Sequence, residues 1–351
     1  MATRRDFIKG AGASGILFCS CGMQRLPVTV NGKRVKTIDV HAHCHFHEAL
    51  ALMGDEASRV MPRVKGAKEH FIVIEECLKG MDAQAIDLEV LSVNPYWYRK
   101  DRDTAAKIVE VQNEKLAELR ASRSDRFAAF ASLALQYPDL AVQQLEKAVK
   151  KQGLRGAAIG GSVLGEDFSD PKFHPVWAKA EKLGAVLFIH PQSTPELAKR
   201  FKGNGWLSNT IGNPLDTTIA LQHLIFEGTL DRFPGLKIIA AHGGGYLGSY
   251  AARGDHACFV APQNCNPDIK LKKQPSGYLN QLYFDALVFT PEALRHLVAQ
   301  VGASQVVIGS DHPIPWEEHP VDHIFATTTL SDEDKIAILG GNAARLFGMQ
   351  G

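Results

Sequence analysis

Residues 35–43 read Val-Lys-Thr-Ile-Asp-Val-His-Ala-His, an apolar stretch that ends in two histidines separated by one residue. Side chains alternate between the two faces of a β-strand, so His41 and His43 would point to the same side and could bind one cation. A single His-x-His pair also occurs in loops that bind nothing. The interpretation as a metal site therefore depends on whether similar strand ends recur in the chain.

Three further apolar runs end in a residue that can bind metal or act as a base. These runs and the residues that follow them are 185–189 with His190, 237–241 with His242, and 305–310 with Asp311. Short apolar runs rich in Val, Ile and Ala are typical of strands in parallel sheets. We therefore expect polar side chains at the ends of several neighbouring strands.

Strand-like segments alternate with helix-like segments along the chain. Helical periodicity is clear in residues 104–122 and 140–150. Ser331, followed by Asp334, is typical of a capping box that opens the last helix, and Gly348 is placed to end that helix. The predicted strands are residues 35–41, 87–93, 127–133, 156–160, 185–190, 237–242, 281–286 and 305–310.

This alternation predicts an α/β fold, a (β/α)8 TIM-type barrel with parallel strands. The alternative is an open doubly wound sheet, but the first strand is followed by His-Ala-His rather than by a glycine-rich phosphate turn. Two longer excursions, residues 44–70 and 258–280, are expected to be loops at the barrel mouth or at a subunit contact.

The composition narrows the class of partner. The chain has 351 residues, a formal net charge of +1 and 22% charged residues, so no broad electrostatic field attracts nucleic acid. No apolar run approaches the roughly 20 residues that span a bilayer, so we expect no transmembrane segment. A small-molecule partner is the remaining expectation.

The N-terminus reads Ala2-Thr-Arg-Arg-Asp-Phe-Ile-Lys9 before a weakly apolar stretch, residues 10–21. This pattern resembles a twin-arginine export signal. We interpret residues 1–30 as signal and linker and residues 31–351 as the barrel domain. The expectation is a periplasmic protein; the alternative is a basic tail on a cytoplasmic one.

The six cysteines include no Cys-x-x-Cys pair, so a zinc ribbon or a thioredoxin-like redox site is not indicated. Cys258 and Cys265 are expected to be free thiols, with a disulfide between them as the alternative in an oxidising compartment. Cys44 lies beside His43 but has no dedicated base, so we do not expect it to act as a nucleophile.

In a parallel barrel the active site forms at the carboxyl ends of the strands. Five residues meet that condition: His41, His43, His190, His242 and Asp311. Three neutral imidazoles and one carboxylate suit a divalent zinc ion with an open position for water. Taken singly, each histidine could be a buried core residue, and Asp311 could cap the segment that follows it.

The chain resembles the amidohydrolase superfamily, and within it the branch of aminocarboxymuconate-semialdehyde decarboxylase and related aromatic-acid decarboxylases. The resemblance extends from about residue 35 to the end of the chain. The segments that carry it are 37–43 (TIDVHAH), 81–91 (MDAQAIDLEVL), Asn213-Pro214 with Thr217, 242–245 (HGGG), 309–313 (GSDHP) and 341–343 (GNA).

The resemblance implies one divalent metal ion, bound by His41, His43, His190 and Asp311. It also implies that His242 is the base that activates metal-bound water, with Asp311 serving both as ligand and as catalytic residue. His242 as a further ligand is the alternative. Binuclear members place a lysine at the end of the fourth strand, where this chain has 157–161 (AAIGG), so the resemblance implies one ion rather than two.

The activity implied is the decarboxylation of an unsaturated or aromatic carboxylic acid. A hydrolase that opens a lactone or amide with the same activated water is the first alternative, and an exported, non-catalytic metal-binding protein is the second. Arg253, eleven residues after His242, matches in spacing the arginine that related decarboxylases lend to a neighbouring subunit, which implies a homodimer. Asn94 and Trp97, after the second strand, are expected to line the substrate pocket.

Overall fold

The computed structural model describes residues 27–54, 57, 64, 71, 73–192 and 194–349. Within this part of the chain, eight parallel strands form a closed barrel. An antiparallel hairpin precedes them and consists of β1 (Thr29–Val30) and β2 (Lys33–Arg34). The barrel strands are β3 (Ile38–His43), β4 (Leu88–Ser92), β5 (Phe127–Ala129), β6 (Gly156–Ile159), β7 (Val186–Ile189), β8 (Lys237–Ala240), β9 (Leu282–Asp285) and β10 (Val306–Val307).

Two seams close the barrel. Strands pair in chain order from β3 to β5 and from β6 to β10. A parallel bridge between Ala131 and Ala157 joins the first group to the second, and a bridge between Asp39 and Ile308 joins the last strand to the first. At the second seam the Val40 N–H donates to the Ile308 carbonyl at 3.0 Å. The predicted (β/α)8 barrel is confirmed, and the open sheet is excluded because no strand edge remains unpaired across these seams.

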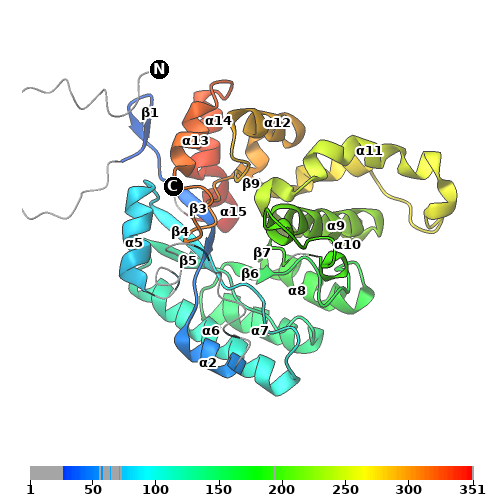
Figure 1. Cartoon of the computed structure of the whole chain (residues 1–351), viewed down its shortest axis with the longest axis horizontal. Coiled ribbons are helices and arrows are strands. Elements are labelled where there is room, and N and C mark those ends of the chain that lie inside the picture. Colours follow the sequence, from blue (N-terminus) through cyan, green and yellow to red (C-terminus); the bar gives the residue numbers. More distant parts are fainter. Residues whose placement is uncertain are drawn as a thin grey trace, which may run out of the picture.

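The helices form an outer layer around the strands, and α11 extends away from the barrel body at the right of the view (Figure 1). Their bounds are α2 (His47–Met53), α5 (Ile74–Ala83), α6 (Arg102–Ser122), α7 (Pro138–Lys151), α8 (His174–Leu183), α9 (Asn213–Phe226), α10 (Thr229–Arg232), α11 (Leu247–Val260), α12 (Pro291–Val301), α13 (Pro320–Ala326), α14 (Asp332–Ile336) and α15 (Asn342–Phe347).

Local signals place the helix ends. The Asp101 side chain accepts from the Thr104 N–H, so α6 begins at Arg102, slightly before the predicted segment. The capping box of Ser331 and Asp334 opens α14 as predicted. A π-helical turn joins α14 to α15, which ends at Gly348 in the left-handed region with φ of 62°.

The two long excursions differ from the prediction of plain loops. Helix α2 (His47–Met53) occupies the start of the first one, and much of its remainder lies outside the described residues. In the second, α11 continues to Val260, and a 3-10 segment covers Pro275–Gln281. The prediction of free thiols at Cys258 and Cys265 is wrong: these cysteines form a disulfide at the outer end of α11. Sequence spacing alone did not reveal that the chain turns back on itself there.

The core has an inner and an outer part. Inside the barrel, side chains such as Val40, Phe130 and Phe188 form one buried cluster with Phe347 of α15. The backbone carbonyl of Phe347 accepts from Arg155, just before β6, so α15 closes the amino-terminal end of the barrel. With that end filled by apolar side chains, a polar site can form only at the carboxyl ends of the strands.

The predicted export signal, residues 1–30, lies outside the described residues except for its last few positions. In the part of the chain that the structure covers, no helix combines the length and hydrophobicity needed to cross a bilayer.

Candidate metal centre

The four residues predicted as ligands meet at the carboxyl end of the barrel. His41 and His43 lie at the end of β3, His190 follows β7, and Asp311 follows β10. One ligand atom from each of these residues lies within 4.8 Å of the others, and all four residues are buried. The predicted convergence of these strand ends is confirmed.

The polar atoms of this group fit a cation. In the described part of the chain, His41 Nε2, His43 Nε2 and both ring nitrogens of His190 have no hydrogen-bond partner, although they are shielded from solvent. Asp311 Oδ1 lies 2.9 Å from His43 Nε2 and 3.3 Å from His41 Nε2. Each buried polar atom without a partner costs roughly 1–3 kcal/mol. A divalent ion would satisfy these atoms together, so the donor set suits the metal that the sequence implied.

Hydrogen bonds on the far side of two imidazoles orient them. Asp285 Oδ2 lies 2.6 Å from His41 Nδ1, and Ser92 Oγ lies 2.9 Å from His43 Nδ1. The Ser92 hydroxyl in turn donates to the Ala42 carbonyl at 3.1 Å. With Nδ1–H donated outward in both rings, the Nε2 lone pairs are left for a metal ion.

His242 lies next to the ligand group without belonging to it. Its Nε2 is 3.9 Å from Asp311 Oδ2, and its side chain is 14% exposed, whereas that of Asp311 is 3% exposed. Asp285 holds the turn, because its carboxylate accepts the backbone N–H of His242 at 2.9 Å and of Gly243 at 2.8 Å. His242 is thus a partly accessible imidazole beside the centre, the position that a general acid or base requires.

Burial and neighbouring charges shift the pKa values of the residues in the centre in different directions. Burial alone raises the pKa of Asp311, but His41 and the neighbouring imidazoles outweigh this effect and hold the pKa well below the usual range. Burial lowers the pKa of His41, but the carboxylates of Asp311 and Asp285 reverse that shift and raise the pKa to about 10. For His190, burial followed by repulsion from His43 and His41 lowers the pKa well below normal. A neutral His190 and a charged Asp311 are in the protonation states that metal ligands need, whereas the raised pKa of His41 means that a bound metal ion would displace a proton from its Nε2.

Asn94 and Tyr96 follow β4, the strand that pairs with β3. The Asn94 amide N–H donates to the Tyr96 hydroxyl at 3.4 Å, and Asn94 Oδ1 has no partner among the described residues. Burial raises the pKa of Tyr96, and the Asp311 carboxylate adds to this rise, which places the Tyr96 hydroxyl within electrostatic range of the centre. Asn94 Oδ1 thus keeps an unused acceptor, and its contact with a substrate stays a prediction.

Trp97 has a different environment from the one predicted. Its side chain is fully buried in the main hydrophobic cluster, and its indole N–H donates to the Leu133 carbonyl at 2.9 Å. Because its one polar atom is already used, we correct the prediction: packing accounts for Trp97, and we do not assign it a substrate contact.

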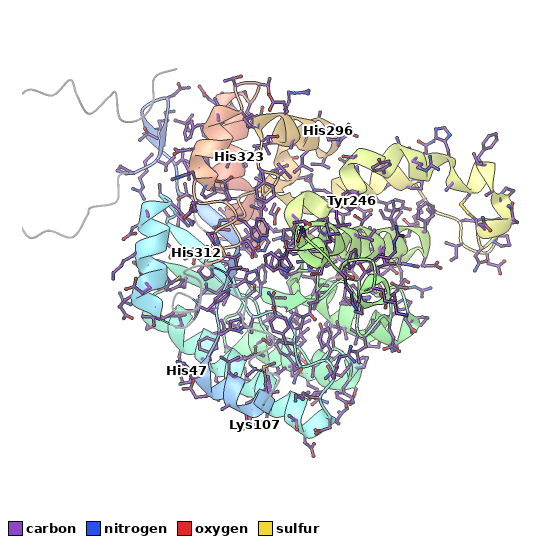
Figure 2. All side chains as sticks on the ribbon, in the orientation of Figure 1. His47, Lys107, Tyr246, His296, His312 and His323 are labelled. Carbon is purple, nitrogen blue, oxygen red and sulfur yellow. A yellow bond between two sulfur atoms is a disulfide. The ribbon has the colours of Figure 1, made fainter. Side chains whose placement is uncertain are left out.

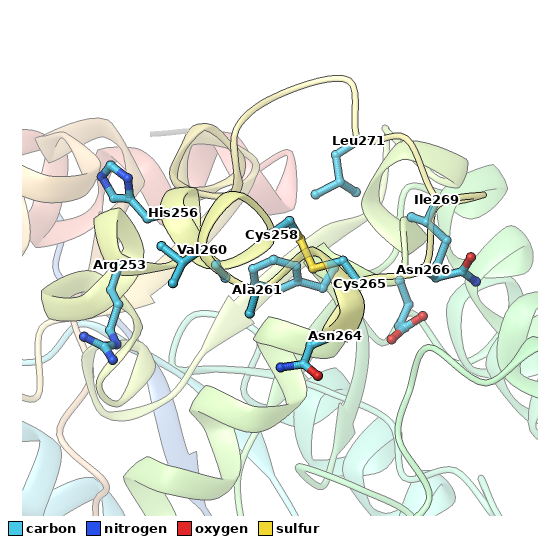
Figure 3. A pocket seen from close by; sticks show the side chains of 13 residues that line it. Arg253, His256, Cys258, Val260, Ala261, Asn264, Cys265, Asn266, Ile269 and Leu271 are labelled. Carbon is cyan, nitrogen blue, oxygen red and sulfur yellow. A yellow bond between two sulfur atoms is a disulfide. The ribbon is translucent and has the colours of Figure 1, made fainter.

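Arg253 lies outside the metal centre. It is exposed on α11 and lines a groove of about 590 Å³ together with the Cys258–Cys265 disulfide (Figure 3). None of the predicted metal ligands lines this groove. Within one chain, therefore, Arg253 belongs to the projecting helix α11 and not to the metal centre.

Sequence reasoning missed a second polar group beneath the ligands. His312 Nδ1 lies 2.8 Å from Glu89 Oε1 of β4, and both side chains are buried. The signal available in the sequence was a glutamate inside the apolar run Leu88-Glu-Val-Leu91. A buried carboxylate needs a partner, although the pattern alone does not say which one.

Comparison with known proteins places these residues in a family context. A model of the amidohydrolase family matches residues 38–349. The 2-amino-3-carboxymuconate-6-semialdehyde decarboxylase of Dictyostelium discoideum is 32% identical over 280 residues, which cover 78% of this chain and 76% of that protein. The gamma-resorcylate decarboxylase of Rhizobium radiobacter is 32% identical over 286 residues, covering 78% of this chain and 86% of the relative.

Solved structures give the same context. The 5-carboxyvanillate decarboxylase of Sphingomonas paucimobilis superimposes with a TM-score of 0.81 at 25% identity, covering 90% of this chain and 100% of that one. A dihydroxybenzoic acid decarboxylase from Polaromonas, solved with bound manganese and 2-nitroresorcinol, has a TM-score of 0.78 at 27% identity, with 90% and 97% of the two chains covered. These four proteins are decarboxylases, and one of them was solved with bound manganese.

Proposed function

This chain belongs to the amidohydrolase family, and we propose that it is a metal-dependent decarboxylase that acts on an unsaturated or aromatic carboxylic acid. The observation that carries the proposal is the buried group of His41, His43, His190 and Asp311. This complete ligand set, with His242 beside it, lies in a chain whose relatives are carboxy-lyases. Most of these relatives are named as decarboxylases of aromatic acids, so an aromatic acid is the narrower substrate class that we propose.

The ion we propose is zinc, one per chain. Three imidazoles and one carboxylate are a donor set typical of zinc sites that keep an open position. Manganese in the similar Polaromonas structure is the competing identity. Elemental analysis of the purified protein, followed by reconstitution of the apoprotein with each ion, decides between them.

The reaction that we propose breaks one carbon–carbon bond. When bound, a divalent ion acts as a Lewis acid that stabilises negative charge on substrate oxygens. The bond to the carboxylate carbon breaks, CO2 leaves, and the electron pair remains on the carbon that carried the carboxylate. That carbon must then receive a proton. We propose that the His242 imidazole transfers this proton. Asp285 keeps His242 beside the ligands by accepting its backbone N–H.

A paired substrate screen tests the proposal. Metal-loaded protein is expected to release CO2 from at least one acid among gamma-resorcylate, 5-carboxyvanillate and 2-amino-3-carboxymuconate-6-semialdehyde, and a chelator should abolish the release. A parallel panel of lactones and amides should remain intact. Ring opening without CO2 release would instead identify a hydrolase. Bound metal with no turnover in either panel would favour the non-catalytic metal-binding protein.

We also propose that the enzyme is a homodimer in which Arg253 of one chain contacts the substrate carboxylate in the other. Its exposure on the projecting α11 supports this role, since a cation there can reach a neighbouring molecule. Arg253→Ala and His242→Asn are each expected to be inactive. Mixed in equal amounts and reassembled, they should regain about a quarter of the wild-type rate, because each mixed dimer contains one intact site. A mixture as inactive as its components would rule out sharing, and the exposed Arg295→Ala serves as the control.

Export through the twin-arginine route is a further proposal, with the cytoplasm as the alternative. The Cys258–Cys265 disulfide supports export, because such bonds persist mainly in oxidising compartments. In a bacterial host, the double change Arg4→Lys and Arg5→Lys should keep the protein in the cytoplasm, while the wild type reaches the periplasm. Fractionation measures both, and equal periplasmic amounts would contradict export by this route.

A further inference from the structure

A second buried polar cluster lies against the metal centre. His312 Nδ1 is 2.8 Å from Glu89 Oε1, and the Cys77 thiol donates to Glu89 Oε2 at 3.3 Å. The side chains of His312 and Glu89 are 5% and 0% exposed. Charged groups are rarely buried to this extent unless they are paired, and removing one partner leaves a costly charge behind. Because this buried pair lies next to the metal ligands, we infer that it has a role in the site.

The His312 ring occupies the space left by the absent side chain of Gly80, which we call the Gly80 socket. A Cβ atom added at Gly80 of α5 would lie 2.3 Å from His312 Nε2 and 2.9 Å from Cε1. Figure 2 labels His312 on the side of the barrel that α5 covers. The imidazole therefore lies between Gly80 of helix α5 on one side and Glu89 of β4 on the other.

The backbone of His312 is tied to the ligand strand. Its carbonyl accepts the His43 N–H at 2.7 Å, and its own N–H donates to Ser310 Oγ at 3.0 Å. The Ser310 hydroxyl in turn donates to the buried Asp39 carboxylate. Residues on both sides of Asp311 are thus anchored to the barrel wall.

Asp311 itself has a strained backbone. Its φ is 64°, in the left-handed region that residues with a Cβ rarely adopt. Its N–H donates to the His41 carbonyl at 2.9 Å, so the turn is closed directly onto the first ligand. A conformation of this kind costs roughly 1–3 kcal/mol and persists only where its surroundings determine it strongly.

We propose that Glu89, acting through His312 in the Gly80 socket, is a positioning residue that holds the strained Asp311 turn so that its carboxylate faces the imidazole ligands. The contact between Glu89 and His312 supplies the anchor on the carboxyl side of Asp311, as Ser310 supplies it on the other side. This inference rests on the metal centre of the proposed function, but it does not depend on which reaction the centre catalyses.

The cluster differs from the metal centre in how its groups are paired. Cys77, Glu89 and His312 place three potential ligand atoms within 4.8 Å of one another. This cluster offers three such atoms against four in the metal centre, and Glu89 Oε2 already accepts from the Cys77 thiol. Glu89 Oε1 lies 2.8 Å from His312 Nδ1, although this approach does not have hydrogen-bond geometry. We therefore assign the cluster to positioning rather than to a second ion.

Two variants perturb the pair from opposite sides. Glu89→Gln removes the carboxylate charge and keeps the shape of the side chain. Gly80→Ala keeps both side chains of the pair and places a methyl group against the His312 ring, at a position in helix α5 where alanine suits the backbone. The matched control is Trp177→Phe, which removes a buried hydrogen bond of 2.8 Å to the Phe168 carbonyl on the outer layer.

The readouts are the zinc dissociation constant, measured by competition with a chromophoric chelator, and the absorption spectrum of the cobalt-substituted protein. Glu89→Gln and Gly80→Ala should each weaken zinc binding by about tenfold or more, which is the loss of affinity typical when a residue that orients a metal ligand is changed. Both variants should also alter the cobalt spectrum. Trp177→Phe should lower thermal stability and leave both readouts unchanged. In a His312→Ala background, Gly80→Ala should have no further effect, since the ring that it strikes is gone.

Zinc affinity within twofold of wild type and an unchanged cobalt spectrum in the folded variants would overturn the proposal. If Glu89→Gln does not fold, Gly80→Ala decides alone. Two zinc ions per chain, of which Cys77→Ser loses one, would also overturn it by showing a second metal site. Failure of the CO2 assay leaves these binding results intact, so the two proposals fail separately.

Discussion

Asp311→Asn is expected to leave the protein with little bound metal and to lower turnover by at least about 10³-fold. Asp311 is the only carboxylate in the ligand group, and its Oδ1 lies 2.9 Å from His43 Nε2. The amide keeps the shape but removes the negative charge that balances a buried cation. Loss of an outer partner of a ligand already costs roughly 10–100-fold in affinity or activity, so loss of a charged ligand must cost more.

Metal content and thermal denaturation with and without zinc measure this effect. A ligand at a thousand times its dissociation constant stabilises the folded state by about 4.1 kcal/mol. The wild type should therefore melt at a clearly higher temperature with zinc, and Asp311→Asn should lose that shift. Asp125→Asn, at an exposed position, is the control and should retain it. A variant that binds zinc as tightly as the wild type would remove Asp311 from the ligand set.

His242→Asn is expected to retain metal and to lose turnover by roughly 10²–10⁴-fold, the range typical of a missing general acid or base. Asparagine is preferred to alanine here, because His242 has φ of 56° and asparagine tolerates the left-handed region. The substitution also preserves the backbone N–H that donates to Asp285 at 2.9 Å. The loss should therefore report on the imidazole alone.

Single-turnover rates and metal content, measured on the same preparations, separate the two roles open to His242. Unchanged metal content with a large loss of rate supports proton transfer. Loss of the metal as well would make His242 a further ligand, and an unchanged rate would exclude it from catalysis. His296→Ala on the exposed face of α12 is the control (Figure 2), because it removes an imidazole that lies outside the centre.

The site was largely predictable because its signal is local. His190 and Asp311 each end an apolar run, and strand periodicity together with the alternation of helices leads to a barrel. In such a barrel all strands end at one rim, so residues far apart in sequence must meet there. The four-ligand group follows from this rule without any knowledge of contacts.

Other predictions failed because they depended on which segments pack together. Cys258 and Cys265 form a disulfide rather than remaining free, since the chain reverses direction after α11. Trp97 enters the core because the Leu133 carbonyl, from beyond the next strand, accepts its indole N–H. Neither partner is visible in the local pattern around these residues.

By itself, the sequence determined that parallel strands would close into a barrel and that three imidazoles and a carboxylate would gather at one rim. Periodicity and residue type are local properties, and they are enough for that. Only the tertiary structure decided which nitrogen of His41 faces the centre, because Asp285 accepts from the other one. It also decided that His312 turns toward Glu89, because a rotamer depends on the space and the charges that neighbouring elements supply.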